Sequence, residues 1–261
     1  MNAPEHRLPP ARLGIVAVAA LAYVLGDVLH ELGHAAATLL PLGVRAISIS
    51  TIGLTTSSSS PIVAAAGPLA NLVLALAILS PFVSALPPAW RYFGWLFGSV
   101  NLFNATAYLI YSAVLGSGDF AVVFPALARP SLWRLGAGLG GLVLYAAAVV
   151  VSRAALRRLV ASQVLDPTEV RRHCAISYWS GGLLVTAGSA FNPVSPWFIL
   201  TSGAAVGFGA MAGLLLLPPL FGPARPGAAP GSPSIGWAWV VAGAIAAIAF
   251  VALLGPGVSL S

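Results

Sequence analysis

Long apolar runs, most of them near the length needed to cross a bilayer, dominate this 261-residue chain. Only 7% of its residues are charged, whereas soluble domains carry about a quarter. We therefore expect an all-α polytopic membrane protein. The predicted spans number seven, or six if the short fifth run is half of a broken helix, and they cover 13–40, 61–86, 91–115, 132–152, 176–191, 197–219 and 236–256.

The segments between the spans are short, and none predicts a separate soluble domain. Residues 44–60 follow the first span and alternate apolar and polar side chains, which indicates a short β-hairpin-like segment. The single cysteine, Cys174, excludes an internal disulfide and a cysteine metal cluster. The predicted organisation is an N-terminal tail (1–12), a membrane core (13–125) and a C-terminal membrane region (126–261).

The net charge of +6 comes from 12 arginines without any lysine. Because these arginines flank the spans, they indicate membrane topology rather than a nucleic-acid partner. With a cytoplasmic N-terminus, nine arginines lie inside and only Arg45, Arg129 and Arg134 lie outside. We expect a multi-pass protein of a bacterial cell membrane, in contact with the lipid bilayer. The sequence does not indicate an oligomeric state.

The first span contains "GDVLHELGH" (26–34), which places Asp27, His30, Glu31 and His34 on one helical face. Ionisable groups at membrane depth are costly and are usually functional. The pattern His-Glu-x-x-His brings two imidazoles together on adjacent turns, where they can bind one Zn²⁺. The intervening glutamate can then act as a general base. The stretch therefore predicts a zinc site made by His30 and His34, with Glu31 as the base.

A catalytic zinc site needs a third protein ligand. Asp119 follows the third span, which runs parallel to the first, so it emerges on the same side as His30 and His34. Asp27 is the other option, although it is better suited to orienting an imidazole from behind the ligand. A helix cap is the alternative role for Asp119. The remaining acids and histidines are expected on the opposite side, and they are Glu5, His6, Asp166, Glu169 and His173.

Three stretches together resemble the site-2 protease family of intramembrane zinc metalloproteases: "HELGH" (30–34), "AAGPLANL" (65–72) and "NLFNATAYLIYSAVLGSGD" (101–119). The resemblance is to a divergent member, because Phe120 rather than glycine follows Asp119 and the usual prolines before the aspartate are absent. It covers roughly residues 13–125 and implies a three-helix core. The implied roles are base for Glu31, zinc ligands for His30, His34 and Asp119, and substrate or oxyanion contacts for Asn71, Asn101 and Asn104.

These features predict a zinc-dependent intramembrane endopeptidase that cleaves a transmembrane segment of another membrane protein. For Asn71, a hydrogen bond between helices is an equally good alternative. Segment 44–60 is either a surface hairpin or an edge that pairs with extended substrate. Two other functions stay open for the whole chain. One is a non-catalytic membrane protein with a structural or regulatory metal site. The other is a metal transporter, which the clustering of ionisable groups at one end of one helix disfavours.

Overall fold

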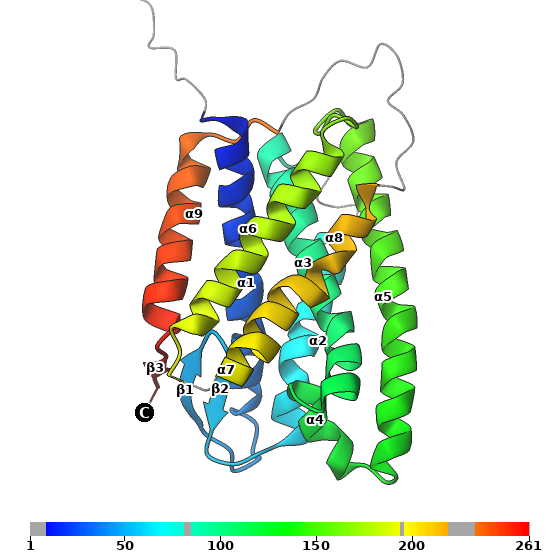
Figure 1. Cartoon of the computed structure of the whole chain (residues 1–261), viewed down its shortest axis with the longest axis vertical. Helices are drawn as coiled ribbons and strands as arrows, with labels where there is room; N and C mark the ends of the chain where they lie inside the picture. The colour runs from blue at the N-terminus through cyan, green and yellow to red at the C-terminus, as the bar shows by residue number, and fades with distance from the viewer. Residues whose placement is uncertain (1–8, 81–84, 194–195, 219–232, 261) are drawn as a thin grey trace, which may run out of the picture.

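A computed structural model describes residues 9–80, 85–193, 196–218 and 233–260 as a helical bundle with a small sheet at one end (Figure 1). Glu5, His6, Arg7 and Arg225 lie outside the described residues, as does most of the expected tail 1–12. The main helices are α1 (Ala11–Ala37), α2 (Pro61–Ile78), α3 (Pro88–Leu115), α4 (Asp119–Val123), α5 (Pro130–Ala161), α6 (Val170–Ala190) and α9 (Trp237–Ala249). The shorter helical elements are η2 (Phe124–Ala126), α7 (Pro196–Phe198), η3 (Ile199–Gly209), η4 (Ala210–Ala212), α8 (Gly213–Leu216) and η6 (Phe250–Leu254).

The polytopic helical fold is confirmed. Within the described residues, five helical segments are long and apolar enough to cross a membrane, namely α1, α2, α5, Ile199–Leu216 and Trp237–Leu254. A sixth is formed by α3 together with Asp119–Ala126, which are bent by 59° relative to each other. Six is the lower of the two expected numbers. The expected span 176–191 lies in α6, which crosses the bundle obliquely in Figure 1 but is too polar to belong to this group.

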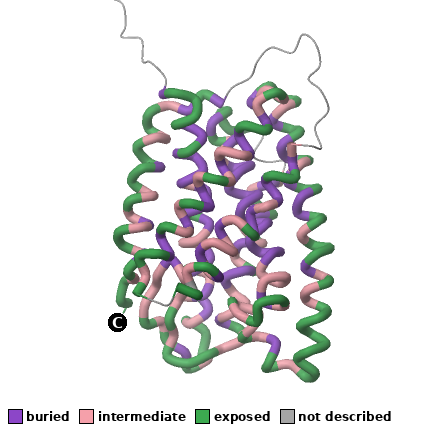
Figure 2. The backbone as a smooth tube through the Cα atoms, viewed as in Figure 1, coloured by how far each residue is buried: buried purple, intermediate pink, exposed green. Residues whose placement is uncertain are grey.

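Helix α1 lies inside the bundle, where it packs against α2, α3, α6 and α9. In its most apolar 18-residue stretch 61% is buried inside the bundle, compared with 22% in that of α5 and 11% in Trp237–Leu254. Figure 2 shows the same contrast between a buried interior and exposed outer helices. The exposed positions of α5 and α9 carry large apolar side chains such as Leu135, Val143 and Ile248, which suit contact with lipid. The ionisable face of α1 therefore meets other helices rather than lipid.

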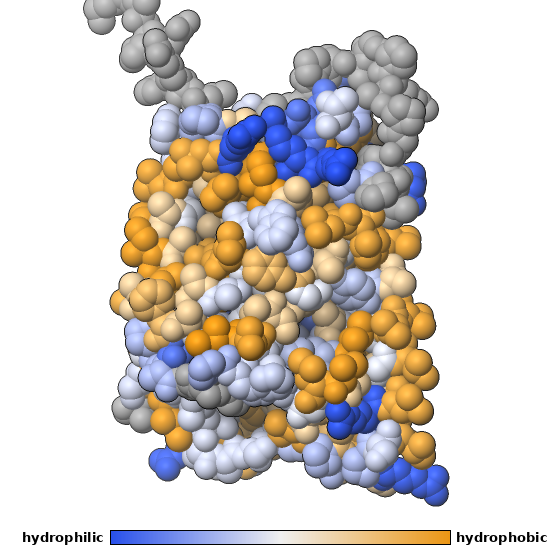
Figure 3. All heavy atoms as spheres, in the orientation of Figure 1, coloured by the Kyte–Doolittle hydropathy of each residue, from blue (hydrophilic) through white to orange (hydrophobic). Residues whose placement is uncertain are grey.

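The two ends of the bundle differ in charge. Helices α1, α3 and α6 begin, and α5 ends, at the upper end of the bundle in Figure 1, where Figure 3 shows a band of hydrophilic side chains; smaller hydrophilic groups lie at the lower end. Arg12, Arg91, Arg171 and Arg172 belong to these helix starts, and Arg158 belongs to the end of α5. The opposite end carries the sheet and the start of α4. This separation is what a cytoplasmic N-terminus predicts, and the side of the membrane remains a prediction.

The segment after α1 forms the expected hairpin, in which β1 (Ala46–Ser50) pairs antiparallel with β2 (Gly53–Thr56). A third strand was not expected: β3 (Val258–Ser259), close to the C-terminus, pairs with the other edge of β1. The strand order is β2-β1-β3 in the described part of the chain. Strand β2 therefore keeps an edge without a strand partner, and it contacts α1.

Candidate metal centre

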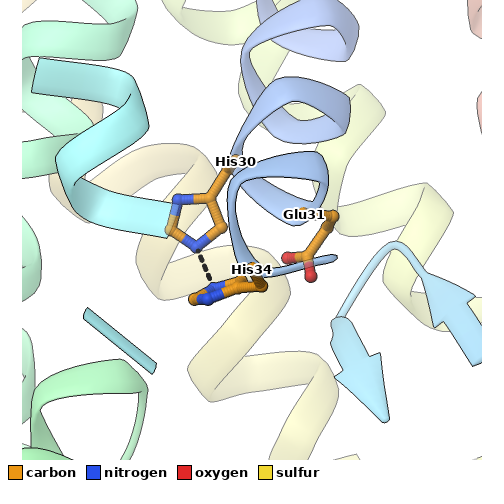
Figure 4. A group of neighbouring side chains, drawn as sticks. All are labelled: His30, Glu31 and His34. Carbon is orange, nitrogen blue, oxygen red and sulfur yellow. Dashed lines mark hydrogen bonds between the residues drawn. The ribbon is translucent and has the colours of Figure 1, made fainter. Parts of the chain in front are cut away.

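The His-Glu-x-x-His group lies near the sheet end of α1 and is buried. His30, Glu31 and His34 are each 5% exposed or less, so neither bulk water nor lipid surrounds them. Their potential ligand atoms all lie within 4.8 Å of one another, which is close enough to hold a metal ion. Figure 4 shows the two imidazoles turned toward each other and the Glu31 carboxylate on the side of the hairpin.

Asp119 joins the two histidines from a different helix. Its Oδ2 lies 3.1 Å from His30 Nε2, and its Oδ1 lies 3.4 Å from His34 Nε2. The two Nε2 atoms are 3.1 Å apart. In a tetrahedral zinc site with bonds of about 2.0–2.1 Å, neighbouring ligand atoms are about 3.3 Å apart. The three observed distances are close to this spacing, with one Asp119 oxygen facing each imidazole.

The turn between α3 and α4 brings Asp119 to this position. Gly116 caps the end of α3 with a left-handed backbone (φ 65°), and Gly118 follows with φ 81°. Residues other than glycine rarely adopt such backbone angles. The two glycines let the chain turn back after α3, so that Asp119 begins α4 beside α1.

Both imidazoles are oriented through their Nδ1 atoms. His30 Nδ1 lies 3.1 Å from Asn71 Oδ1, and His34 Nδ1 lies 2.6 Å from the Val63 carbonyl oxygen. Since both oxygens can only accept, the Nδ1–H groups donate. The Gly67 N–H also faces His34 Nδ1 but lies farther away, at 3.3 Å. This arrangement directs both Nε2 atoms toward each other and toward the Asp119 carboxylate, where a metal ion, or a proton on one imidazole, can join them.

Gly67 on α2 leaves the space that such a cation needs. A Cβ at this position would lie 2.7 Å from His30 Nε2 and still closer to His34 Nε2. The position next to both Nε2 atoms is therefore open only because residue 67 has no side chain. Gly33 on α1 has a similar role in packing, because a Cβ there would lie 2.7 Å from the Ala70 Cβ. The two glycines allow α1 and α2 to approach closely at the site.

Glu31 lines a cavity of about 220 Å³ together with His34, Asp119, Tyr108 and Leu54. Among the described residues, Glu31 Oε2 has no hydrogen-bond partner. The backbone amide of Leu54, in β2, faces the same carboxylate. A buried carboxylate oxygen without a partner is costly, which is typical of a group that acts on a ligand. Glu31 thus lies beside the two imidazoles and the Asp119 carboxylate and lines the cavity.

The other predicted site residues lie at varying distances from this cavity. Asn71 contacts His30 from behind, as described above. Asn101 donates from Nδ2 to the Phe97 carbonyl of its own helix, and Asn104 lines a neighbouring apolar cavity. The Asp27 carboxylate is one turn before Glu31, and its buried Oδ2 has no hydrogen-bond partner in the described chain. None of these four side chains lines the cavity of about 220 Å³ beside Glu31, which we call the metal cavity.

Tyr108 is the main contact that motif reasoning did not assign. Its ring stacks on His30, with centroids 5.0 Å apart and planes at 24°. The recurrence of Asn101, Asn104, Tyr108 and Tyr111 at helical spacing was the signal for a polar face on α3. This face divides between two cavities: Tyr108 and Tyr111 line both, whereas Asn104 lines only the apolar one.

Comparisons with protein-family models, with curated proteins and with solved structures find no match. The function is therefore inferred from the site itself: a polytopic membrane protein with a buried His-Glu-x-x-His group that could hold a metal ion.

Proposed function

We propose that the protein is a zinc-dependent intramembrane endopeptidase that cleaves a transmembrane segment of another membrane protein. The observation that carries this proposal is the convergence of His30 Nε2, His34 Nε2 and the two Asp119 carboxylate oxygens, with distances of 3.1–3.4 Å. Two imidazoles and one carboxylate are the donor set of many catalytic zinc sites, which keep a fourth position open. The motif resemblance to site-2 proteases points to the same assignment.

Bound zinc supplies Lewis acidity, which activates water and polarises the scissile carbonyl. Glu31 supplies the proton chemistry. The residue lines the cavity, and its Oε2 has no hydrogen-bond partner in the described chain, so the carboxylate is placed to accept a proton from water and to deliver it to the leaving amide nitrogen. Asn71 and the Val63 carbonyl keep His30 and His34 in the orientation that presents Nε2.

The hairpin supports a peptide substrate over a small molecule. Gly53, Leu54 and Thr56 of β2 line the cavity that Glu31 also lines. A transmembrane helix must unwind before hydrolysis, and its freed backbone groups then need partners. The β1 edge is already paired with β3, whereas β2 has no strand partner on its outer side in the described chain. Extended substrate can therefore pair with β2 and pass Glu31.

The main alternative is a non-catalytic protein with a structural or regulatory metal site. A structural zinc site is closed by four protein ligands, so Glu31 would have to be the fourth ligand there, whereas a catalytic site keeps this position open. Glu31 lines the cavity beside His34 and Asp119. The position of Glu31 on the cavity wall therefore favours catalysis.

The comparison of wild type with Glu31→Gln separates these functions. The amide keeps the size of the side chain but removes its basicity, and loss of a general base typically slows a reaction by about 10²–10⁴-fold. Wild-type and Glu31→Gln protein should both carry metal in the membranes of the cells that express them. Peptide fragments of at least one membrane protein should appear only with wild type. Identical fragment patterns, with metal bound in both forms, would support the non-catalytic alternative.

A further inference from the structure

The last span continues into a segment, residues 250–260, that contacts the hairpin beside the metal cavity. The segment contains η6 and β3, and we call it the C-terminal clamp. Figure 1 shows β3 next to β1 at the sheet end of the bundle, below α9. Strand β1 is the middle strand of the described sheet, so the C-terminal clamp holds one side of β1 and β2 lies on the other side.

Backbone hydrogen bonds join the C-terminal clamp to the hairpin at two places. Strand β3 pairs antiparallel with β1, and just beyond it the Leu260 N–H donates to the Ile47 carbonyl oxygen at 2.8 Å. At the turn between β1 and β2, the Thr51 N–H donates to the Leu254 carbonyl oxygen at 3.1 Å. The hairpin is therefore held both along β1 and at its turn.

Side-chain packing fixes the same turn against the bundle. Thr51 is 4% exposed and Phe250 of the C-terminal clamp is fully buried. A Cβ at Gly188 on α6 would lie 2.6 Å from Phe250 Cε1 and 3.1 Å from Thr51 Cγ2. The turn, the C-terminal clamp and α6 thus meet without room for one more methyl group, and close packing of this kind transmits a displacement from one element to the next.

The residues that follow the anchored turn belong to the metal cavity. Ile52, Gly53 and Leu54 line it together with Glu31. The Leu54 backbone amide faces the Glu31 carboxylate, and Leu54 lies only three residues after Thr51. A shift of the turn would therefore move both the Leu54 N–H and the edge of β2 that has no strand partner in the described chain.

We propose that the C-terminal clamp is a positioning element of the metal centre. By holding β1 and Thr51, it keeps the Leu54 N–H at Glu31 and sets the distance between the β2 edge and the two imidazoles. An extended peptide paired with β2 then presents its carbonyl group at the metal. The role toward the peptide rests on the proposed function, whereas the role toward the hairpin does not.

Full-length variants of β3 test the inference. Val258→Pro combined with Leu260→Pro removes two N–H donors, because the donors that face β1 alternate along an antiparallel strand. The matched control, Val258→Ala with Leu260→Ala, shortens the same side chains, which are 40% and 51% exposed, but keeps both N–H groups.

Two measurements compare the zinc-loaded proteins. Hydrogen exchange of the amides of residues 46–56 reports on the hairpin itself. Binding of two hydroxamates reports on the cavity: acetohydroxamate chelates the metal alone, whereas tri-leucine hydroxamate chelates with the same group and adds an extended backbone. The ratio of the two affinities therefore measures pairing with β2, separately from metal binding.

The proline variant should exchange its hairpin amides about tenfold faster and lose about tenfold of its preference for the peptide hydroxamate, the effect of one or two backbone hydrogen bonds. Its zinc content and its affinity for acetohydroxamate should not change, since the candidate ligands belong to α1 and α4. The alanine control should behave like wild type.

Unchanged exchange and an unchanged preference in the proline variant would overturn the inference. Equal effects of proline and alanine would also contradict it, as would loss of zinc, which would show that the C-terminal clamp supports the whole core. If the proline variant does not fold, deletion of residues 257–261 removes β3 and takes its place. Wild type without a preference for the peptide hydroxamate would contradict substrate pairing with β2, and hydrogen exchange would still decide whether the C-terminal clamp positions the hairpin.

Discussion

His30 on α1 and Asp119 on α4 bring Nε2 and Oδ2 within 3.1 Å of each other, although the whole of α2 and α3 separates them in the sequence. The His34 Nε2 lies 3.1 Å from His30 Nε2 and 3.4 Å from Asp119 Oδ1. Ligands from two helices make metal binding depend on the packing of the core.

Asp119→Ala should weaken zinc retention more than Asp27→Ala. Asp119 approaches both Nε2 atoms, whereas the orienting contacts of the histidines come from Asn71 and Val63 rather than from Asp27. Zinc content after dialysis against a weak chelator measures the difference. The opposite ranking of the two variants would assign the third ligand to Asp27.

Gly67→Ala should abolish zinc binding while leaving α2 helical. The added methyl group would occupy the space next to both Nε2 atoms, and overpacking of this kind typically costs about 1–3 kcal/mol. The matched control is Gly136→Ala on α5, where a Cβ meets nothing within 4 Å. Normal zinc content in Gly67→Ala would show that the metal does not lie beside α2.

Asn71→Ala should lower zinc affinity by about 10–100-fold, as removal of an orienting partner does in other metal sites. His30 would lose the acceptor that holds its Nδ1–H. Asn101→Ala is the control, because Asn101 is a buried amide that donates to the Phe97 carbonyl of its own helix. Competition with a chromophoric zinc chelator measures both affinities. Equal values for the two variants would argue against the orienting role.

Maleimide labelling tests the predicted topology. Cys174 is buried, and its replacement by serine gives a background without cysteine. Ser58→Cys places an exposed thiol at the sheet end, and Ala161→Cys places one at the arginine-rich end. With a cytoplasmic N-terminus, an impermeant maleimide should label position 58 in intact cells and position 161 only after permeabilisation. The reverse pattern would place the metal centre on the cytosolic side.

The features predicted correctly from sequence are those with a local signal. Apolar runs identify most spans because crossing a bilayer requires about 20 apolar residues. The span predicted at 176–191 has a weaker basis, since α6 begins with Arg171, Arg172 and His173 and continues with serines and glycines. The proximity of His30, Glu31 and His34 follows from helical spacing within one element. The number of spans between His34 and Asp119 predicts that both lie on the same side of the membrane.

Features that depend on packing between distant elements could not be predicted. The two residues of β3 carry no strand pattern of their own, and they pair only because the C-terminal end returns beside β1. Gly67 belongs to the "AAGPLANL" motif, but its role follows from its closeness to two imidazoles on another helix. The sequence also placed Asn104 and Tyr108 on one face, whereas the rotation of α3 directs Asn104 toward a different cavity.

The zinc content of the purified full-length protein, combined with X-ray absorption at the zinc edge, tests the central claim most directly. The account predicts about one zinc per chain in wild type and in Glu31→Gln, bound by two imidazoles and oxygen ligands at about 2.0–2.2 Å. His30→Ala and His34→Ala should each lose the metal. Wild-type protein that contains no zinc after purification with zinc supplied would contradict the account, as would zinc retained when both histidines are replaced.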